Sequence, residues 1–180
     1  MKKNFERLIK IIAILVLGVF AISCGKGGKG SAEPGSIEAI KKAGKIRIGV
    51  FGDKPPFGFV DENGKNQGYD IYLAKRLAKD LLGDENKIEF ITLEAANRVE
   101  YLLSNKVDII LANFTVTDER KQKVDFAKPY MKVSLGIVSP EGAPIKDVKE
   151  LKGKKLIVNK GTTAEIYFTK NYPDIELLKY

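Results

Sequence analysis

The sequence predicts an α/β fold, and three observations support this prediction. Apolar segments typical of buried strands occur at 45–50, 88–93 and 107–111. Segments with helical spacing of apolar residues lie between them, over 71–82 and from about 97 to 105. Loops rich in polar residues and glycine follow the strand ends, where open α/β sheets bind their ligands. The alternation of strands and helices therefore favours a sheet with a binding site at its carboxyl edge.

The predicted helices begin and end at capping residues. A short helix is expected between Ser36, as its N-cap, and Gly44 at its C-terminal end. We expect Asp70 to cap the helix that follows it. Asn97, with Glu100 three residues later, predicts a capping box at the start of the next helix.

A second group of elements follows the third strand. These elements are a strand over 131–140, a short helix over 147–151, a strand over 155–158, a helix from about 164 to 171 and a last strand over 175–180. The strand over 155–158 begins a second, smaller α/β region.

Short polar side chains and one arginine follow the strand at 107–111. Asn113, Thr115 and Thr117 alternate with apolar residues, and Arg120 comes five residues after Thr115. A guanidinium group can bind a carboxylate through two parallel, charge-assisted hydrogen bonds. The stretch therefore predicts a site for a small carboxylate. The alternative is that Arg120 is a solvated residue in a charged turn.

Two threonines follow a glycine at the end of the strand over 155–158. Gly161, Thr162 and Thr163 lead from this strand into a helix. Free N–H groups at the positive end of a helix dipole form a ready anion site. The alternative is that one of the threonines only caps the helix.

The stretch over 113–130 resembles the signature of the polar amino-acid-binding proteins of ABC importers. This solute-binding family has a two-lobed periplasmic-binding-protein (Venus flytrap) fold. The shared pattern is Thr-x-Thr, an acidic pair, an arginine and an apolar-Asp-Phe-x-x-Pro-Tyr run, which reads here TVTDER and VDFAKPY. The segments PFGF at 56–59 and GYDI at 68–71 match the family's first-strand signature. The resemblance implies an essentially complete first lobe and a partial second lobe, closest to the cysteine-binding branch.

The resemblance also implies roles for individual residues. The turn over 161–163 would close over the α-carboxylate of the ligand, opposite Arg120. The loop with Lys54 and Phe57 would contribute to the pocket, and Arg98 would lie near the ligand's side chain. Lysine stands at position 54 where relatives often carry an aromatic residue, which favours a polar or acidic ligand feature. The alternatives are a solvated Lys54 and a Phe57 packed in the core.

The first 23 residues have the layout of a bacterial lipoprotein signal peptide. Positive residues precede an apolar run over 11–22, which is too short for a comfortable membrane span. The run ends in Ala-Ile-Ser-Cys, which predicts Cys24 as the lipidated first residue of the mature chain. An ordinary secretory signal is the alternative. The segment over 24–35 is rich in glycine and predicts a flexible tether.

The composition excludes several kinds of site. The 180 residues contain one cysteine, no histidine and no tryptophan, so Cys/His metal clusters and His-based triads are excluded. The net charge of +8 falls to +5 once the four Lys/Arg and one Glu of residues 1–23 are removed. This charge is spread along the chain without a basic and aromatic cluster, so we predict no nucleic-acid partner. No metal or cofactor is predicted.

We therefore predict four segments. They are a signal peptide over 1–23, a tether over 24–35, a first ligand-binding lobe over 36–136 and part of a second lobe over 137–180. The last segment is short against the roughly 100 residues of a typical domain. Because the resemblance reaches only the first two-thirds of a family member, the chain is expected to be a truncated product or a fragment.

The predicted function is that of a monomeric, membrane-anchored receptor for a polar amino acid. Cysteine or an acidic amino acid is favoured, and lobe closure on the ligand would precede its delivery to an ABC permease. The protein would lie in the periplasm or at the cell surface, and no catalysis is predicted. The alternatives are an enzyme on the same fold, similar to cyclohexadienyl dehydratase, and a surface antigen or adhesin with a non-functional cleft.

Overall fold

The computed structural model of the chain describes residues 32–180. The predicted signal peptide, the lipidated Cys24 and the tether as far as residue 31 lie outside the described residues. Residues 32–180 belong to one unit of the structure. Within this unit, none of the helices has both the length and the apolar character needed to cross a bilayer.

The elements of residues 32–180 alternate between helices and strands. In chain order they are α2 (Ile37–Ala43), β1 (Ile46–Val50), β2 (Asp53–Lys54), β3 (Gly58–Val60), β4 (Asn66–Gln67), α3 (Tyr69–Leu82), β5 (Ile88–Thr92), the 3-10 helix η1 (Ala95–Asn97), α4 (Arg98–Leu103), β6 (Ile109–Leu111), α5 (Asp118–Lys121), the 3-10 helix η2 (Val148–Leu151), β7 (Lys155–Val158), α6 (Thr163–Asn171) and β8 (Glu176–Lys179).

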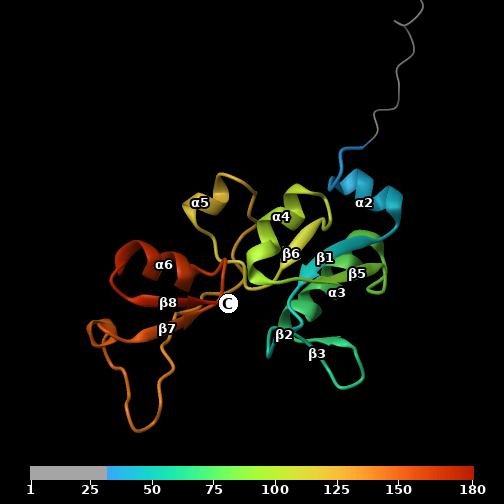
Figure 1. The fold of residues 1–180 in the computed structure, drawn as a ribbon. Coiled ribbons are helices and arrows are strands. Elements are labelled where there is room, and N and C mark those ends of the chain that lie inside the picture. The colour runs from blue at the N-terminus through green and yellow to red at the C-terminus, as the bar shows by residue number, and fades with distance from the viewer. Residues whose placement is uncertain (1–31) are drawn as a thin grey trace, which may run out of the picture. The chain divides into compact units, whose positions relative to one another are not determined.

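The larger sheet is parallel and has the strand order β5-β1-β6 (Figure 1). β1 is the central strand, with Ile48 opposite Phe90 of β5 and opposite Ile109 of β6. Parallel strands end at the same edge of a sheet, so the residues that follow them meet there. Phe51, Leu93 and Ala112, each just beyond one of the three strands, form a buried cluster. The candidate site is built beside this cluster.

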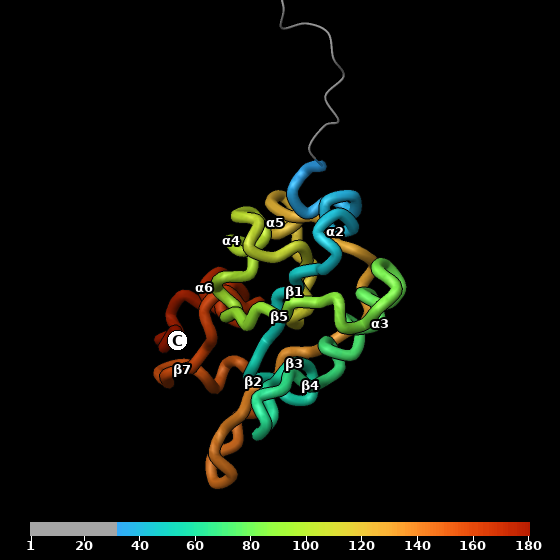
Figure 2. Tube along the Cα trace, turned by 90° about the vertical axis from the view of Figure 1, so that its right-hand side faces the viewer, coloured from blue at the N-terminus to red at the C-terminus, as the bar shows by residue number. Residues whose placement is uncertain are grey.

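Helices cover both faces of the larger sheet, with α3 and α4 on opposite sides of β1 (Figure 2). On one face, Ile46, Ile48 and Val50 are fully buried against Ala74 and other small residues of α3. On the other face, β1 presents Gly49, where a Cβ would lie 2.5 Å from a Leu93 methyl group. The glycine therefore lets the residues beyond β5 pack directly on β1.

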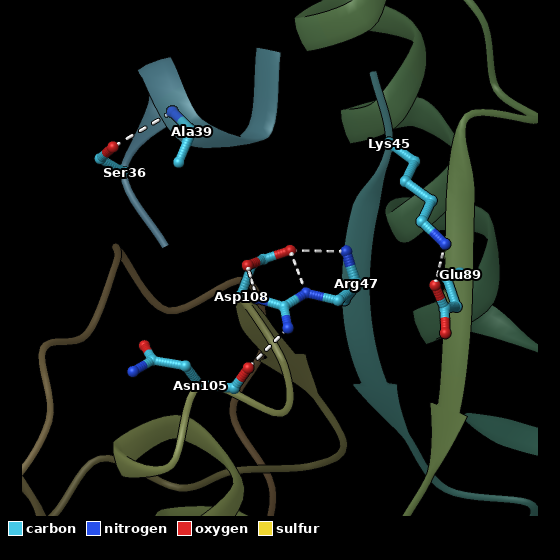
Figure 3. A network of polar contacts seen from close by, with 7 residues as sticks. All are labelled: Ser36, Ala39, Lys45, Arg47, Glu89, Asn105 and Asp108. Atoms are coloured by element: carbon cyan, nitrogen blue, oxygen red, sulfur yellow. Dashed lines mark hydrogen bonds and ion pairs between the residues drawn. The ribbon is translucent and has the colours of Figure 1, made fainter. Parts of the chain in front are cut away.

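A partly buried ion pair joins β1 to the start of β6 (Figure 3). The Asp108 carboxylate accepts hydrogen bonds from the backbone N–H of Arg47 at 2.7 Å, from its Nε at 3.2 Å and from its Nη2 at 2.5 Å. Arg47 Nη1 also donates to the Asn105 carbonyl at 2.6 Å. These contacts hold the turn between α4 and β6 against β1, and so hold the strand that leads to the candidate site.

The second sheet is a parallel pair, β7 and β8, with Leu156 opposite Leu177. The helix α6 connects the two strands and packs Phe168 in a small core with Leu151 and Ile175 (Figure 1). This core is separate from the core of the larger sheet. The predicted strand–helix–strand order of the last 26 residues is therefore confirmed.

The caps of α2 are confirmed, but two other predicted caps are wrong. The Ser36 hydroxyl accepts from the Ala39 N–H at 3.2 Å, and Gly44 has a left-handed backbone at the end of α2. At α3, Gly68 and not Asp70 is the N-cap, with φ of 116°. A Cβ on Gly68 would lie 2.2 Å from the Phe57 carbonyl oxygen, so close packing selects glycine there.

Asn97 makes no side-chain cap at α4. Its backbone is already helical, with φ of −89° and ψ of −6°, because η1 runs directly into α4. An N-cap side chain needs an extended backbone to reach the next N–H groups. The predicted capping box is therefore absent.

The predicted strand over 131–140 is also wrong. The segment has the apolar alternation of a strand, but it pairs with no strand among residues 32–180. A strand is stabilised by the hydrogen-bond ladder to a neighbour, and apolar alternation alone does not supply one. Val133, Leu135 and Val138 of this segment are exposed.

Candidate functional site

Two buried arginines form the centre of the candidate site. Arg98 is only 3% exposed and Arg120 only 6% exposed. Within the part of the chain that the structure describes, neither forms an ion pair with a carboxylate. Buried cations are usually paired with an acid, so two without one mark a place where an anion is favoured.

Arg120 lies in α5, the short helix that follows the Thr-x-Thr stretch. Thr117 caps this helix by accepting from the Arg120 N–H at 3.2 Å. The guanidinium donates from Nη1 to the Thr115 carbonyl at 2.7 Å and from Nη2 to the Gly161 carbonyl at 2.8 Å. An arginine has five side-chain N–H donors. Among residues 32–180, the other three donors of Arg120 have no partner, and they remain free to bind a carboxylate.

Arg98 is the first residue of α4, and its side chain bonds only to backbone carbonyls. Nε donates to Ala95 at 2.9 Å, Nη1 to Ala112 at 3.0 Å and Asn113 at 3.2 Å, and Nη2 to Gly161 at 2.9 Å. Four of its five donors are therefore satisfied by the protein itself. Arg98 thus differs from Arg120 in having almost no hydrogen-bonding capacity left for a ligand.

Two phenylalanine rings contact the cations. The guanidinium carbons of Arg98 and Arg120 lie 4.7 Å and 4.5 Å from the ring centroid of Phe114. Arg98 also lies 5.5 Å from the ring of Phe51, and the Lys54 Nζ lies 5.6 Å from the same ring. The faces of aromatic rings attract cations, most strongly where water is excluded. The rings therefore help to hold positive charges close together in the interior.

The electrostatics of the site reflect this crowding. Burial, and next the neighbouring Arg120, lower the pKa of Arg98 to about 10. Burial also lowers the pKa of Arg120, and the charge of Glu119 opposes that shift. Both guanidinium groups remain charged at neutral pH, and each is less favourably placed than in water. A bound anion would therefore stabilise the charged forms of both arginines.

Gly161 brings the two arginines to one point, because its carbonyl oxygen accepts from both. The residue has a left-handed backbone, with φ of 73°, in the turn between β7 and α6. A Cβ at this position would lie 2.6 Å from the Ala96 Cα and 2.8 Å from the Ala95 carbonyl oxygen. Glycine is therefore required both for the backbone conformation and for the close approach of this turn to η1.

The two threonines after Gly161 start α6. Thr162 is the N-cap, with its hydroxyl accepting from the Glu165 N–H at 3.3 Å and donating to the Asn159 carbonyl at 2.7 Å. The Glu165 carboxylate accepts from the Gly161 N–H at 2.8 Å, and this bond and a stronger one from Lys179 lower its pKa. One backbone N–H at this helix end is therefore already bound by an acid of the chain.

A cavity of about 270 Å³ lies along α6, and neither arginine lines it. Thr163 and Thr117 line it, together with apolar and polar residues of α6 and one residue of the 131–140 segment, namely Leu135, Ile166, Tyr167, Lys170 and Asn171. The two threonines therefore face a space that a bound molecule could enter from the side of α6.

The structure brings most of the predicted site residues together, but not all. Arg98, Asn113, Thr115 and Arg120 share one hydrogen-bond network, and the predicted turn over 161–163 reaches it through Gly161. The solvated-turn interpretation of Arg120 is wrong, since that residue is buried. Thr162 caps α6, and its role in binding stays a prediction.

Lys54 and Phe57 lie outside this network. Lys54 forms an ion pair with Asp53 and reaches the arginines only through the ring of Phe51. The half-buried Phe57 contributes backbone bonds, from its N–H to the Lys54 carbonyl at 2.8 Å and from the Asp70 N–H to its carbonyl at 2.9 Å. Their roles in binding stay predictions.

Sequence reasoning missed Phe51 and Phe114 and the carbonyl of Gly161. A signal was present for the two rings, because each aromatic residue follows the carboxyl end of one of two adjacent strands, β1 and β6. No sequence pattern could have shown that a backbone carbonyl would join both arginines.

A buried acid lies at the start of α3. Asp70 is fully buried, and one carboxylate oxygen accepts from the Tyr130 hydroxyl at 2.9 Å. The other oxygen has no hydrogen-bond partner within residues 32–180. Burial raises the pKa of Asp70, and the bond from Tyr130 and the neighbouring Asn113 N–H oppose this shift. The bond between Tyr130 and Asp70 ties the Pro-Tyr end of the signature stretch to α3, which packs on the larger sheet.

Comparison with known proteins identifies relatives along most of the chain. The family model of the bacterial extracellular solute-binding proteins, family 3, matches residues 46–175. The glutamine-binding protein of an ABC transporter from Bacillus subtilis is 36% identical over 188 residues, which cover 100% of this chain and 67% of that protein.

Two solved structures are more similar still. The solute receptor for L-cysteine of Neisseria gonorrhoeae is 64% identical, with a TM-score of 0.79, and covers 81% of this chain and 59% of its own. The cysteine-binding protein from Campylobacter jejuni is also 64% identical at a TM-score of 0.79, covering 80% of this chain and 58% of its own. The chain thus spans from 58% to 67% of the length of these three proteins.

These likenesses confirm the predicted two-lobed α/β fold class, and the coverage is consistent with a partial second lobe. All three relatives have the names of binding proteins or receptors and not of enzymes. The boundary between the lobes, at residues 136 and 137, stays a prediction.

Proposed function

The chain belongs to the bacterial extracellular solute-binding proteins, family 3, and on this premise we propose that it is a receptor that binds a free amino acid for an ABC importer. The observation that supports this proposal most directly is the state of Arg120. Its guanidinium is buried, has no acidic partner among residues 32–180 and keeps three N–H donors free. A ligand carboxylate supplies both the missing charge and the missing acceptors.

The ligand's α-carboxylate binds Arg120 through two parallel hydrogen bonds. The carbonyls of Thr115 and Gly161 hold the guanidinium plane in place before the ligand arrives, so little side-chain entropy is lost on binding. The N-terminus of α6, at Thr162 and Thr163, adds favourable dipole charge from the other lobe. Asn113, Thr117, Lys54 and Phe57 complete the proposed site around the rest of the ligand.

L-Cysteine is the first candidate ligand. The two relatives at 64% identity are named for cysteine, while the Bacillus relative at 36% identity is named for glutamine. The higher identity favours cysteine. An acidic amino acid is the second candidate ligand, because the two buried cations would also attract its second carboxylate.

In this proposal, the protein binds its ligand outside the cytoplasm, at the surface of a membrane. We propose that the protein is held there as a monomer by a lipid on Cys24, with residues 24–35 as a tether, and passes its ligand to a permease partner. Mass spectrometry of the membrane fraction tests the anchor, with a diacylglyceryl-modified N-terminal Cys24 as the expected species. An unmodified chain that begins elsewhere would contradict it.

The site acts by binding and not by catalysis. An enzyme similar to cyclohexadienyl dehydratase would consume prephenate, and we expect no turnover of prephenate by the purified chain. A surface antigen or adhesin with a non-functional cleft would show no stabilisation by any amino acid. Stabilisation by one amino acid therefore argues against that alternative.

Thermal unfolding of the full chain with each of the twenty amino acids tests the proposal. A ligand at 100 times its Kd stabilises a protein by about 2.7 kcal/mol, which raises the Tm of a domain of this size by several degrees. We expect the largest rise with L-cysteine and a calorimetric titration to give one site per chain. No rise with any amino acid would overturn the proposal.

A further inference from the structure

Arg98 has the geometry of a residue that positions the site and not of one that reads the ligand. Its four hydrogen bonds end on backbone carbonyls of three separate segments, namely η1 at Ala95, the end of β6 at Ala112 and Asn113, and the turn before α6 at Gly161. The side chain is 3% exposed, and Phe51 and Phe114 cover its guanidinium. Little of it can therefore touch a ligand.

The bond from Arg98 to Gly161 links the region of the β5-β1-β6 sheet to the region of the β7-β8 sheet. Arg98 belongs to α4 of the larger sheet region, while Gly161 ends the turn that follows β7. Arg120 donates to the same carbonyl oxygen at 2.8 Å. The position of this oxygen therefore determines both where the α6 N-terminus lies and how the Arg120 guanidinium is oriented.

A side chain that bonds to both segments needs several N–H donors that point in different directions. The carbonyls of Ala112 and Gly161 lie just beyond the ends of β6 and β7, strands of different sheets, and the planar guanidinium reaches both at once. A lysine ammonium would keep the charge but would have one nitrogen where arginine has three. The distinction between charge and geometry can therefore be tested by substitution.

From these contacts we infer that Arg98 is a positioning residue, which fixes the Gly161 turn against the end of β6 so that Arg120 and the α6 N-terminus face the same ligand group. This inference rests on the proposed function of amino-acid binding. It replaces the expectation that Arg98 contacts the ligand's side chain, and it assigns selectivity among amino acids to other residues of the site.

The test compares Arg98→Gln and Arg98→Lys with the wild type and with Arg76→Gln. Arg76 is a matched control, because it is an exposed arginine on α3 that pairs with Asp80. Calorimetric titrations use L-cysteine and every other amino acid that binds the wild-type chain. Loss of one charge-assisted bond corresponds to roughly a tenfold to hundredfold loss of affinity.

We expect both Arg98 variants to lose affinity by that range, and by the same factor for every amino acid. Arg76→Gln should bind as the wild type does. Loss confined to amino acids with one class of side chain, or full affinity in Arg98→Lys, would overturn the inference, because either result means that Arg98 interacts with the ligand through its charge.

Hydrogen exchange of the ligand-free chains separates positioning from general stability and from ligand binding itself. In Arg98→Gln we expect amides at 112–114 and 161–164 to exchange at least tenfold faster, while those of β1 (Ile46–Val50) keep their wild-type rates. Unchanged exchange at 161–164, or an equal rise in β1, would refute the positioning role. If the wild type binds no amino acid, the proposed function fails, and this measurement still decides whether Arg98 fixes the turn.

Discussion

At the scale of single residues, the two arginines show how a protein can bury positive charge without an internal acid. Carbonyl oxygens satisfy the donors, and aromatic faces supply favourable electrostatics. Arg98 is almost fully satisfied in this way, whereas Arg120 is satisfied only in part. This difference is the basis on which we propose Arg120 as the arginine that binds the ligand.

Replacing Arg120 tests this assignment. We expect Arg120→Ala to abolish detectable binding, since loss of two charge-assisted hydrogen bonds costs about 3 to 6 kcal/mol. Arg120→Lys should fail to restore binding, because a single ammonium cannot form the parallel pair. Calorimetry with L-cysteine measures both variants, and wild-type affinity in either one would contradict the assignment.

Replacing Gly161 tests the close approach of the turn. Gly161→Ala combines an unfavourable left-handed backbone with contacts of 2.6 Å and 2.8 Å to the backbone of Ala96 and Ala95. Gly153→Ala is a matched control, because Gly153 has φ of 74° but nothing within 4 Å of its Cβ position. Each alanine costs about 1 kcal/mol for the backbone conformation alone.

We therefore expect Gly153→Ala to lower the free energy of unfolding by about 1 kcal/mol and to leave ligand affinity unchanged. Gly161→Ala should lose more stability than this and should also lose affinity. Chemical denaturation and calorimetry of the two variants give the comparison. Equal effects of the two substitutions would show that η1 does not hold the turn.

At the scale of elements, the position of β6 determines where the site forms. The Arg47–Asp108 pair holds the start of this strand against β1 (Figure 3). The other end of the strand carries Ala112 and Asn113 to Arg98. The bond from Asp108 raises the pKa of Arg47, in agreement with a stabilising pair. Strand register and site geometry are therefore coupled.

Asp108→Asn tests the contribution of this pair. The Asp108 side chain is 5% exposed, so its loss leaves donors of Arg47 poorly satisfied, although Arg47 itself is partly exposed. We expect the free energy of unfolding to fall by about 1 to 3 kcal/mol. The control is Asp80→Asn in the exposed pair on α3, for which about 0.5 kcal/mol or less is expected. Similar losses in both variants would contradict a specific role of the Arg47–Asp108 pair.

The start of α3 gives a prediction about pH. Because burial raises the pKa of Asp70 above its ordinary value of 3.8, the folded state disfavours the ionised carboxylate. Its stabilising contribution is therefore present below pH 3.8 and is lost as the pH rises through the raised pKa. Asp70→Asn removes this titration.

We expect the stability of Asp70→Asn relative to the wild type to increase between pH 4 and pH 7, as measured by urea denaturation at several pH values. A difference for Asp70→Asn that is flat or decreases with pH would mean that the carboxylate is as well stabilised in the fold as in water.

At the scale of the whole molecule, the sequence predicted the fold class and most elements because apolar periodicity reports burial. The three strands β1, β5 and β6 and the helix α3 each have such periodicity, and each was predicted to within two residues of its observed bounds. The predictions that proved wrong depended on tertiary contacts. Gly68 displaced Asp70 as the cap of α3 because of the nearby Phe57 carbonyl, and the 131–140 segment found no strand to pair with.

The sequence predicted which residues form the candidate site better than it predicted the contacts between them. Motif spacing identified Arg120 and the turn over 161–163, and the family resemblance implied a place in the site for Arg98. The rings of Phe51 and Phe114 and the shared carbonyl of Gly161 depend on how segments far apart in sequence meet. That meeting is a property of packing, which local patterns do not encode.

A crystal structure of the full chain grown with L-cysteine tests the central claim most directly. We expect one molecule of the amino acid, with both carboxylate oxygens within about 3 Å of the Arg120 nitrogens and the start of α6 on its other side. A ligand bound elsewhere, or an Arg120 guanidinium that points into solvent while the amino acid is present, would contradict the account.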